Sequence, residues 1–185
     1  ILGFARDILV AAYLGAGPVA DAFFVAFKLP NFFRRLFAEG AFNAAFVPLF
    51  AARLAEAGHD AAQRFAARVM SVMVVFLFCF ITALQIAMPW LMTVIAPGFV
   101  GDTEKFTLAV EMARTTFPYL LFISLVSLMG GVLNTLDRFA AAAATPIILN
   151  IVLITALLTA TPFLPTPGHA LSWGVAAAGI AQFLW

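Results

Sequence analysis

The chain has 185 residues, of which 64% are hydrophobic and only 10% are charged, and its mean hydropathy is +1.07. Ordinary globular chains hold roughly 45–50% apolar and about 25% charged residues, so this composition excludes a water-soluble domain with a polar surface. The formal net charge of +1 leaves no basic field that would attract a nucleic acid. The composition instead predicts an integral membrane protein.

The first third of the chain predicts two helices. Residues 1–14 form an apolar run that ends at the turn-forming stretch 15–18, and a second apolar run covers residues 21–54. Pro30 removes a backbone donor from the middle of this second helix, so we expect a break or kink near residues 28–31, with Pro30 as the hinge.

Three later stretches of the chain carry no Asp, Glu, Lys or Arg. A spanning helix needs about 20 apolar residues, so together these stretches have room for four helices. Pro118 should kink the second of them, and a proline-rich segment should separate the last two. The predicted bounds are about 69–95, 106–136, 140–160 and 169–185, which gives six spans in an all-α protein.

Basic residues in the short connections predict the orientation of the chain. The connection from Arg53 to Arg68 and the later one at Arg138 contain four arginines, whereas the connections on the opposite side contain only Lys105. Because basic loops stay in the cytoplasm, we expect the first helix to start there. Both ends of the chain fall within apolar runs, so we expect the sequence to be part of a longer protein.

Charged side chains are concentrated in the first two predicted helices, although each costs about 2.5–3.5 kcal/mol near the centre of a bilayer. They are Arg6, Asp7, Asp21, Lys28, Arg34, Arg35 and Glu39. Asp21, Lys28 and Arg35 repeat every seven residues, and Glu39 follows one turn later, so these four lie near one stripe. Such a stripe must face a watery cavity or a polar helix, and the helix that carries Arg6 is the expected neighbour.

These charges allow two interpretations. They can pair internally, for example Arg35 with Glu39 and Arg6 with Asp21, or they can line a cationic cavity. Four bases against three acids favour the cavity, and guanidinium groups match phosphate oxygens bidentately, so we expect an anionic ligand. No cluster of residues indicates a metal or another cofactor. Asn134 and Asn150 are expected to hydrogen-bond between helices.

The motifs of the first third resemble the MurJ (MviN) family, the bacterial flippases of lipid-linked peptidoglycan precursor. The matching segments are Ile1–Asp7, Gly15–Gly17, Asp21–Asn31 and Arg34–Phe42, followed by Ala96–Phe99, Phe117–Tyr119, Leu133–Thr135, Arg138–Phe139, Pro146 and Leu149–Asn150. The block from Asp21 to Phe42 is the most specific of these, and the matches span the whole chain in order.

The resemblance implies a fold of two helical lobes with about 14 helices, which rock around a central cavity. This chain would be the six-helix N-terminal part of the first lobe, and the second lobe would be absent from it. The family substrate is lipid II, an undecaprenyl diphosphate that carries a disaccharide-pentapeptide. The family moves it by alternating access to the periplasmic leaflet of the inner membrane, and we expect a monomer surrounded by membrane lipids.

The resemblance also carries the cavity residues over to this sequence. They are Arg6, Asp7, Asp21, Arg34 and Glu39, with Arg35 beside them and with Lys28 and Asn31 in the same matched block. The alternatives are a drug or cation antiporter of the same superfamily, an enzyme acting on prenyl diphosphates, a channel, and a non-transporting scaffold. An antiporter would be expected to use acidic cavity residues, and such an enzyme would need clustered acids for Mg²⁺. The surplus of bases favours the flippase.

Overall fold

The computed structural model describes residues 1–36 and 41–185, and side chains are described for all of these except 41–43. Within this part of the chain the secondary structure is helical throughout, which confirms the all-α prediction. The helices are α1 (Leu2–Leu14), α2 (Pro18–Arg34), α3 (Ala41–Ile95), α4 (Thr103–Thr116), α5 (Tyr119–Thr135), α6 (Phe139–Ala160) and α7 (Pro167–Leu184), with short 3₁₀ turns η2 (Pro97–Phe99) and η3 (Thr161–Phe163).

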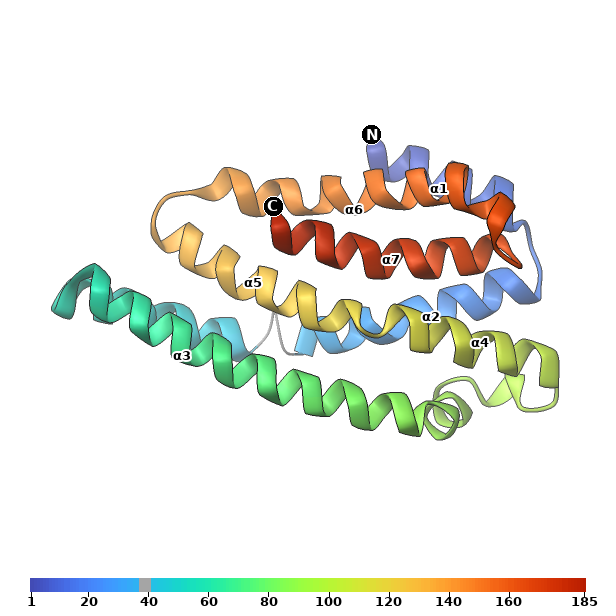
Figure 1. The fold of residues 1–185 in the computed structure, drawn as a ribbon, viewed down its shortest axis with the longest axis horizontal. Helices are drawn as coiled ribbons and strands as arrows, with labels where there is room; N and C mark the ends of the chain where they lie inside the picture. Colours follow the sequence, from blue (N-terminus) through green and yellow to red (C-terminus); the bar gives the residue numbers. More distant parts are fainter. Residues whose placement is uncertain (37–40) are drawn as a thin grey trace.

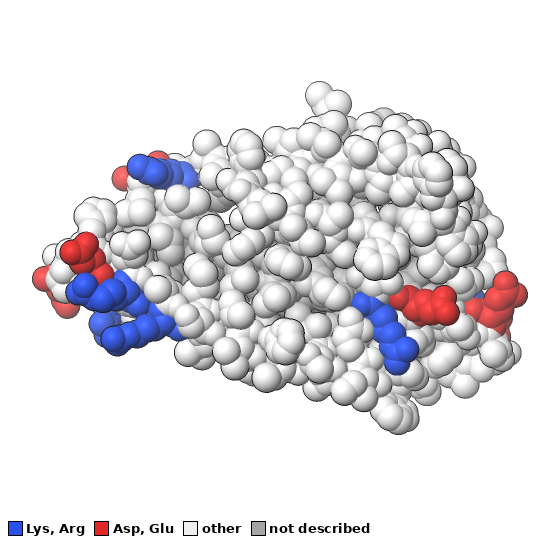
Figure 2. Space-filling view, viewed as in Figure 1, with Lys and Arg blue, Asp and Glu red and all other residues white. Residues whose placement is uncertain are grey.

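The helices run along one long axis and reverse direction at its two ends (Figure 1). The α1–α2, α3–α4 and α6–α7 connections gather at one end, and the α5–α6 connection lies at the other. Within the described residues, three helical segments are long and apolar enough to cross a membrane: Ala44–Ile95, Thr103–Thr135 and Phe139–Phe163. Figure 2 shows charged side chains mainly toward the two ends of this face, with an apolar surface between them, as expected of a bundle that crosses a bilayer.

The predicted helix over residues 21–54 corresponds to α2 and the first part of α3, and the helix is not broken at Pro30. α2 begins earlier, at Pro18, because the fixed φ of proline suits the first helical position. It then continues through Pro30 to Arg34. Pro30 has no N–H to offer the carbonyl of Ala26, but the Thr116 hydroxyl donates to that oxygen at 3.3 Å, so the helix remains intact there.

The predicted connection from Arg53 to Arg68 does contain a chain reversal, but it is helical on both sides of that reversal. α3 is helical on both sides of Gly58, which alone leaves the helical region with φ 77° and ψ −179°. The two arms of α3 fold back on one another at this residue (Figure 1), and the Arg53 guanidinium lies 4.8 Å from the Phe65 ring centroid. Alanine-rich sequence keeps both arms helical, while glycine alone accepts the positive φ without strain.

Two further prolines explain how α3 attaches to α4. Pro89 leaves the carbonyl of Gln85 without its helical donor, and Pro118 does the same to Arg114 while dividing the predicted helix 106–136 into α4 and α5. The Gln85 Nε2 donates to the Arg114 carbonyl at 2.8 Å, and the Arg114 Nε donates to the Gln85 carbonyl at 3.2 Å. The Gln85 side chain therefore satisfies the carbonyl that Pro118 exposes, and the Arg114 side chain satisfies the carbonyl that Pro89 exposes.

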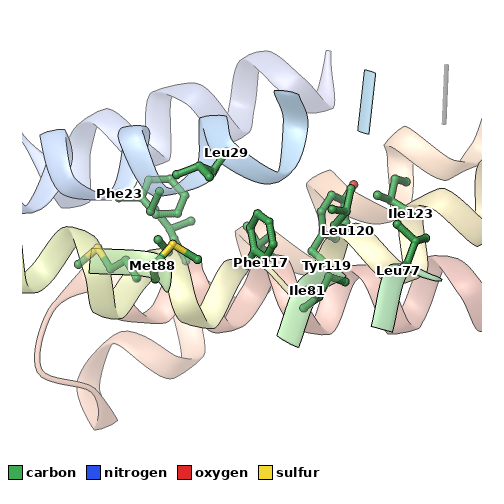
Figure 3. Packing of buried hydrophobic residues seen from close by; sticks show 14 of the residues in the cluster. Phe23, Leu29, Leu77, Ile81, Met88, Phe117, Tyr119, Leu120 and Ile123 are labelled. Carbon is green, nitrogen blue, oxygen red and sulfur yellow. The ribbon is translucent and has the colours of Figure 1, made fainter. Parts of the chain in front are cut away.

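The apolar core lies between α2, α3 and the α4–α5 pair. Phe23 of α2, Met88 of α3 and Phe117 at the α4–α5 junction are all buried there (Figure 3). α7 fits between α5 and α6 because it carries glycines at its contacts. A Cβ at Gly174 would lie only 2.8 Å from the Ala156 Cβ, so small residues permit this close helix approach.

Candidate functional site

A cavity of about 610 Å³ lies where α2, the first arm of α3, α5 and α6 meet. It is lined by Arg34, Val47, Ile123, Val126, Ser127, Gly130, Gly131, Asn134, Thr135, Ala142, Thr145 and Pro146. Arg34 comes from the last turn of α2 and is partly buried. It is the one charged residue among the lining residues that the structure describes.

The α5 wall of this cavity is a single polar and small-residue face. Ser127, Gly130, Gly131 and Asn134 follow the three- and four-residue spacing that places side chains on one side of a helix. A Cβ at Gly130 would lie 3.6 Å from the Ala142 Cβ, which is an ordinary contact. α5 and α6 therefore lie close together at this point of the wall.

Arg6 is held beside the cavity by α6. Its Nη1 donates to the Asn150 Oδ1 at 2.8 Å, and its Nε and Nη2 donate to the Asp7 Oδ1 at 3.0 and 2.7 Å. The Asn150 Nδ2 in turn donates to the carbonyl of Pro146 at 2.9 Å, and Pro146 lines the cavity. The expected interhelical role of Asn150 is confirmed, and it fixes Arg6 relative to the cavity wall.

Asp21 lies at the opposite end of α2. Its carboxylate pairs with the Lys105 Nζ on α4, and this ammonium also lies 4.4 Å from the Phe99 ring centroid. Thirteen residues at 1.5 Å per residue separate Asp21 from Arg34 by about 20 Å along the helix. The suggested pairing of Arg6 with Asp21 is wrong, because Arg6 pairs with Asp7 and Asp21 pairs with Lys105.

The remaining predicted residues of α2 do not share the Arg34 cavity. Lys28 borders a separate cavity of about 350 Å³, which is otherwise apolar and includes Leu91 of α3. The Asn31 Nδ2 donates to the Phe27 carbonyl of its own helix at 2.9 Å, and Arg35 is exposed. Glu39, and with it the suggested Arg35–Glu39 pair, lies outside the described residues.

The structure therefore distributes the predicted charges over several places instead of one cavity. Sequence reasoning missed the uncharged polar wall of Ser127, Thr135 and Thr145, and it expected Asn134 to bond between helices although this residue lines the cavity. The wall on α5 could have been predicted from the helical spacing of its polar and glycine residues, which lie in an otherwise apolar segment. Within the described residues, no group of three His, Cys, Asp or Glu side chains is placed to hold a metal ion.

Comparisons with known proteins all lead to one family. Residues 10–185 match the sequence profile described as "Lipid II flippase MurJ". The chain is 52% identical to a "Probable lipid II flippase MurJ" from Rhizobium tropici, covering 98% of this chain and 35% of the relative. It is 42% identical to the "Lipid II flippase MurJ" of Burkholderia cenocepacia, covering 100% of this chain and 36% of that one.

A solved structure shares the fold. The chain superposes with a TM-score of 0.76 and 31% identity on "Lipid II flippase MurJ, inward closed conformation", over 99% of this chain and 38% of that protein. The chain thus spans little more than a third of the length of the relatives that it matches.

Proposed function

This chain belongs to the MurJ family of lipid II flippases, and we propose that the full-length protein carries lipid II from the cytoplasmic to the periplasmic leaflet of the bacterial inner membrane. The chain would supply the N-terminal part of the first of two lobes. The observation that carries the proposal within this family is the position of Arg34 on the wall of a cavity of about 610 Å³ between four helices.

The chemistry of the substrate accounts for an arginine at this position. A diphosphate that enters the membrane must exchange its hydration shell for donors supplied by protein. The guanidinium of Arg34 offers paired N–H groups that fit phosphate oxygens, and Arg6 offers a second cation, oriented by Asn150 and Asp7. In the proposed mechanism these two arginines hold the diphosphate, while the lipid tail stays in the bilayer and the two lobes rock around the headgroup.

The acidic residues have a proposed role in gating. The Asp21 side chain is 56% exposed although its carboxylate pairs with Lys105, so it remains accessible to a second basic residue. We assign Asp21 and Glu39 the exchange of basic partners between the two access states. Lys28 and Asn31 lie on α2 between Asp21 and Arg34, and Arg35 caps its C-terminal end.

The distribution of basic residues supports a cytoplasmic start of α1. Arg53, Arg64 and Arg68 lie on the two arms of α3 around the Gly58 reversal, and Arg138 lies in the α5–α6 connection at the same end of the molecule (Figure 1). Lys105 lies at the opposite end, near the start of α4. Basic segments of this kind remain on the cytoplasmic side.

A cation antiporter of the same superfamily is the second candidate. It would place acidic side chains on the cavity wall, whereas the described lining residues include Arg34 and no Asp or Glu. The charge of the cavity therefore favours an anionic cargo.

A complementation experiment tests the proposal. The native lipid II flippase is depleted from a bacterium, and the full-length protein, Arg34→Ala and the control Arg64→Ala are supplied at matched expression. We expect growth with the wild type and with Arg64→Ala, and no growth with Arg34→Ala. Absence of growth with a well-expressed wild type would overturn the flippase proposal, and growth with Arg34→Ala would remove Arg34 from the binding site.

A further inference from the structure

We propose that the α5–α6 wall of the Arg34 cavity, through Asn134 and Thr145, is a subsite for the uncharged, hydroxyl- and amide-bearing part of the substrate headgroup that adjoins the diphosphate. This inference rests on the proposed function and adds a second chemical requirement to it. Arg34 recognises the charge of the diphosphate, and the α5–α6 wall recognises the uncharged group that is attached to it.

The polar groups of the wall occur in an otherwise apolar protein. Only 10% of the chain is charged, and the cavity lining combines the side chains of Ser127, Asn134, Thr135 and Thr145 with one guanidinium. Such a lining suits a cargo that carries polar groups of its own better than an apolar cargo, because polar side chains can hydrogen-bond to the former.

The wall offers acceptors as well as donors. The Thr135 hydroxyl donates to the Gly131 carbonyl at 2.9 Å, and the Thr145 hydroxyl donates to the Ala141 carbonyl at 3.4 Å. With its proton used within its own helix, each hydroxyl oxygen presents lone pairs to a ligand. The Asn134 amide supplies both a donor group and an acceptor oxygen.

Pro146 adds a main-chain acceptor to the same wall. It has no N–H to donate to the Ala142 carbonyl, and Ala142 and Pro146 both line the cavity. Elsewhere, carbonyls exposed by proline receive donors from neighbouring helices, as at Ala26 and Gln85. At Ala142 the adjoining space includes the cavity, so a ligand hydroxyl or amide is a suitable donor.

Size and rigidity agree with a headgroup site. A volume of about 610 Å³ falls within the roughly 300–1,000 Å³ of small-molecule pockets. Gly130 and Ala142 line the cavity with small side chains and leave room for a ligand. α7 holds α6 in place, because the Nε2 of the buried Gln182 donates a hydrogen bond to the Thr145 carbonyl at 2.8 Å. The combination of one cation with mixed donors and acceptors fits a glycosyl diphosphate.

Binding of two probes to the purified full-length protein tests the subsite. Lipid II carries the sugar headgroup, and undecaprenyl diphosphate has the same tail and diphosphate without it. We expect Asn134→Leu and Thr145→Val each to weaken lipid II binding several-fold, and together by about tenfold or more. Binding of undecaprenyl diphosphate should not change. Thr159→Val is the matched control, because its hydroxyl donates within α6 to Thr155 and lies outside this cavity.

A second variant keeps the test decisive if Asn134→Leu does not fold. In Gly130→Ala the new methyl meets Ala142 at 3.6 Å, so the helices keep their contact while the cavity narrows, and we again expect selective loss of lipid II binding. Unchanged lipid II affinity in all three variants would overturn the subsite, as would equal weakening of both probes. Failure of the wild type to bind either probe would instead overturn the flippase proposal.

Discussion

The Thr116 hydroxyl on α4 lies 3.3 Å from the carbonyl oxygen of Ala26 on α2, in a buried interface. Ala26 is the residue whose carbonyl Pro30 leaves without a helical donor. The same hydroxyl also lies 3.2 Å from the Ala113 carbonyl of its own helix, so its hydrogen is shared between two acceptors. α4 thereby supports α2 along the segment that leads from Asp21 to Arg34.

Replacement of Thr116 by Val should lower stability through this carbonyl. Valine has nearly the same shape but no hydroxyl, so the buried Ala26 oxygen loses its donor at a cost of about 1–3 kcal/mol. Thermal unfolding of the purified full-length protein measures the effect. Thr107→Val is the control, because that hydroxyl donates to its own helix at an exposed position. Equal melting temperatures for the two variants would refute the role of Thr116.

Gln85→Leu and Arg114→Met should each destabilise the protein by about 1 kcal/mol, since each removes one donor to a proline-exposed carbonyl. Their effects should nearly add, although the residues are in contact. Each side chain bonds to the backbone of the other, so the two hydrogen bonds are separate. Denaturation of both single variants and the double variant measures this. A coupling free energy above about 1 kcal/mol would contradict the arrangement.

Asn150→Leu should impair function by releasing Arg6 from α6. The Arg6 Nη1 loses its 2.8 Å bond to Oδ1, and a charged hydrogen bond of this type contributes about 1.5–3 kcal/mol. We expect lipid II binding by the full-length protein to weaken about tenfold, with little change in expression. Asn150→Gln retains an acceptor oxygen and an amide donor without adding a charge, and it should bind more tightly than Asn150→Leu does. The same loss in both variants would exclude an orienting role.

Gly174→Ala should destabilise the α6–α7 contact. The added methyl would lie 2.8 Å from the Ala156 Cβ and 3.2 Å from the Leu153 Cδ2, and overpacking of this kind costs about 1–3 kcal/mol. Gly98→Ala is the control, because a Cβ there meets no atom within 4 Å. The comparison of melting temperatures should show a loss only at Gly174, and an unchanged or higher value there would contradict the packing.

The amino-acid sequence by itself determined the class of protein and most of its helices. Apolar run length, turn-forming residues and missing charge are local properties. The first two mark α1, and all three mark α6 and α7, within a few residues of their bounds. Two details differ from the prediction where local signals conflict. Pro30 does not break α2, since the Thr116 hydroxyl donates to the Ala26 carbonyl that Pro30 leaves without a helical donor, and the connection from Arg53 to Arg68 is helical on both sides of Gly58.

Only the tertiary structure decided which side chains meet. Helical periodicity placed Asp21, Lys28 and Arg35 on one stripe, but it carries no information about the helix that packs against each turn. Asp21 pairs with Lys105, 84 residues away, and Arg6 bonds to Asn150, 144 residues away. The polar wall at Asn134 and Thr145 likewise exists only because small residues let α5 and α6 approach, a consequence of packing that no local pattern specifies.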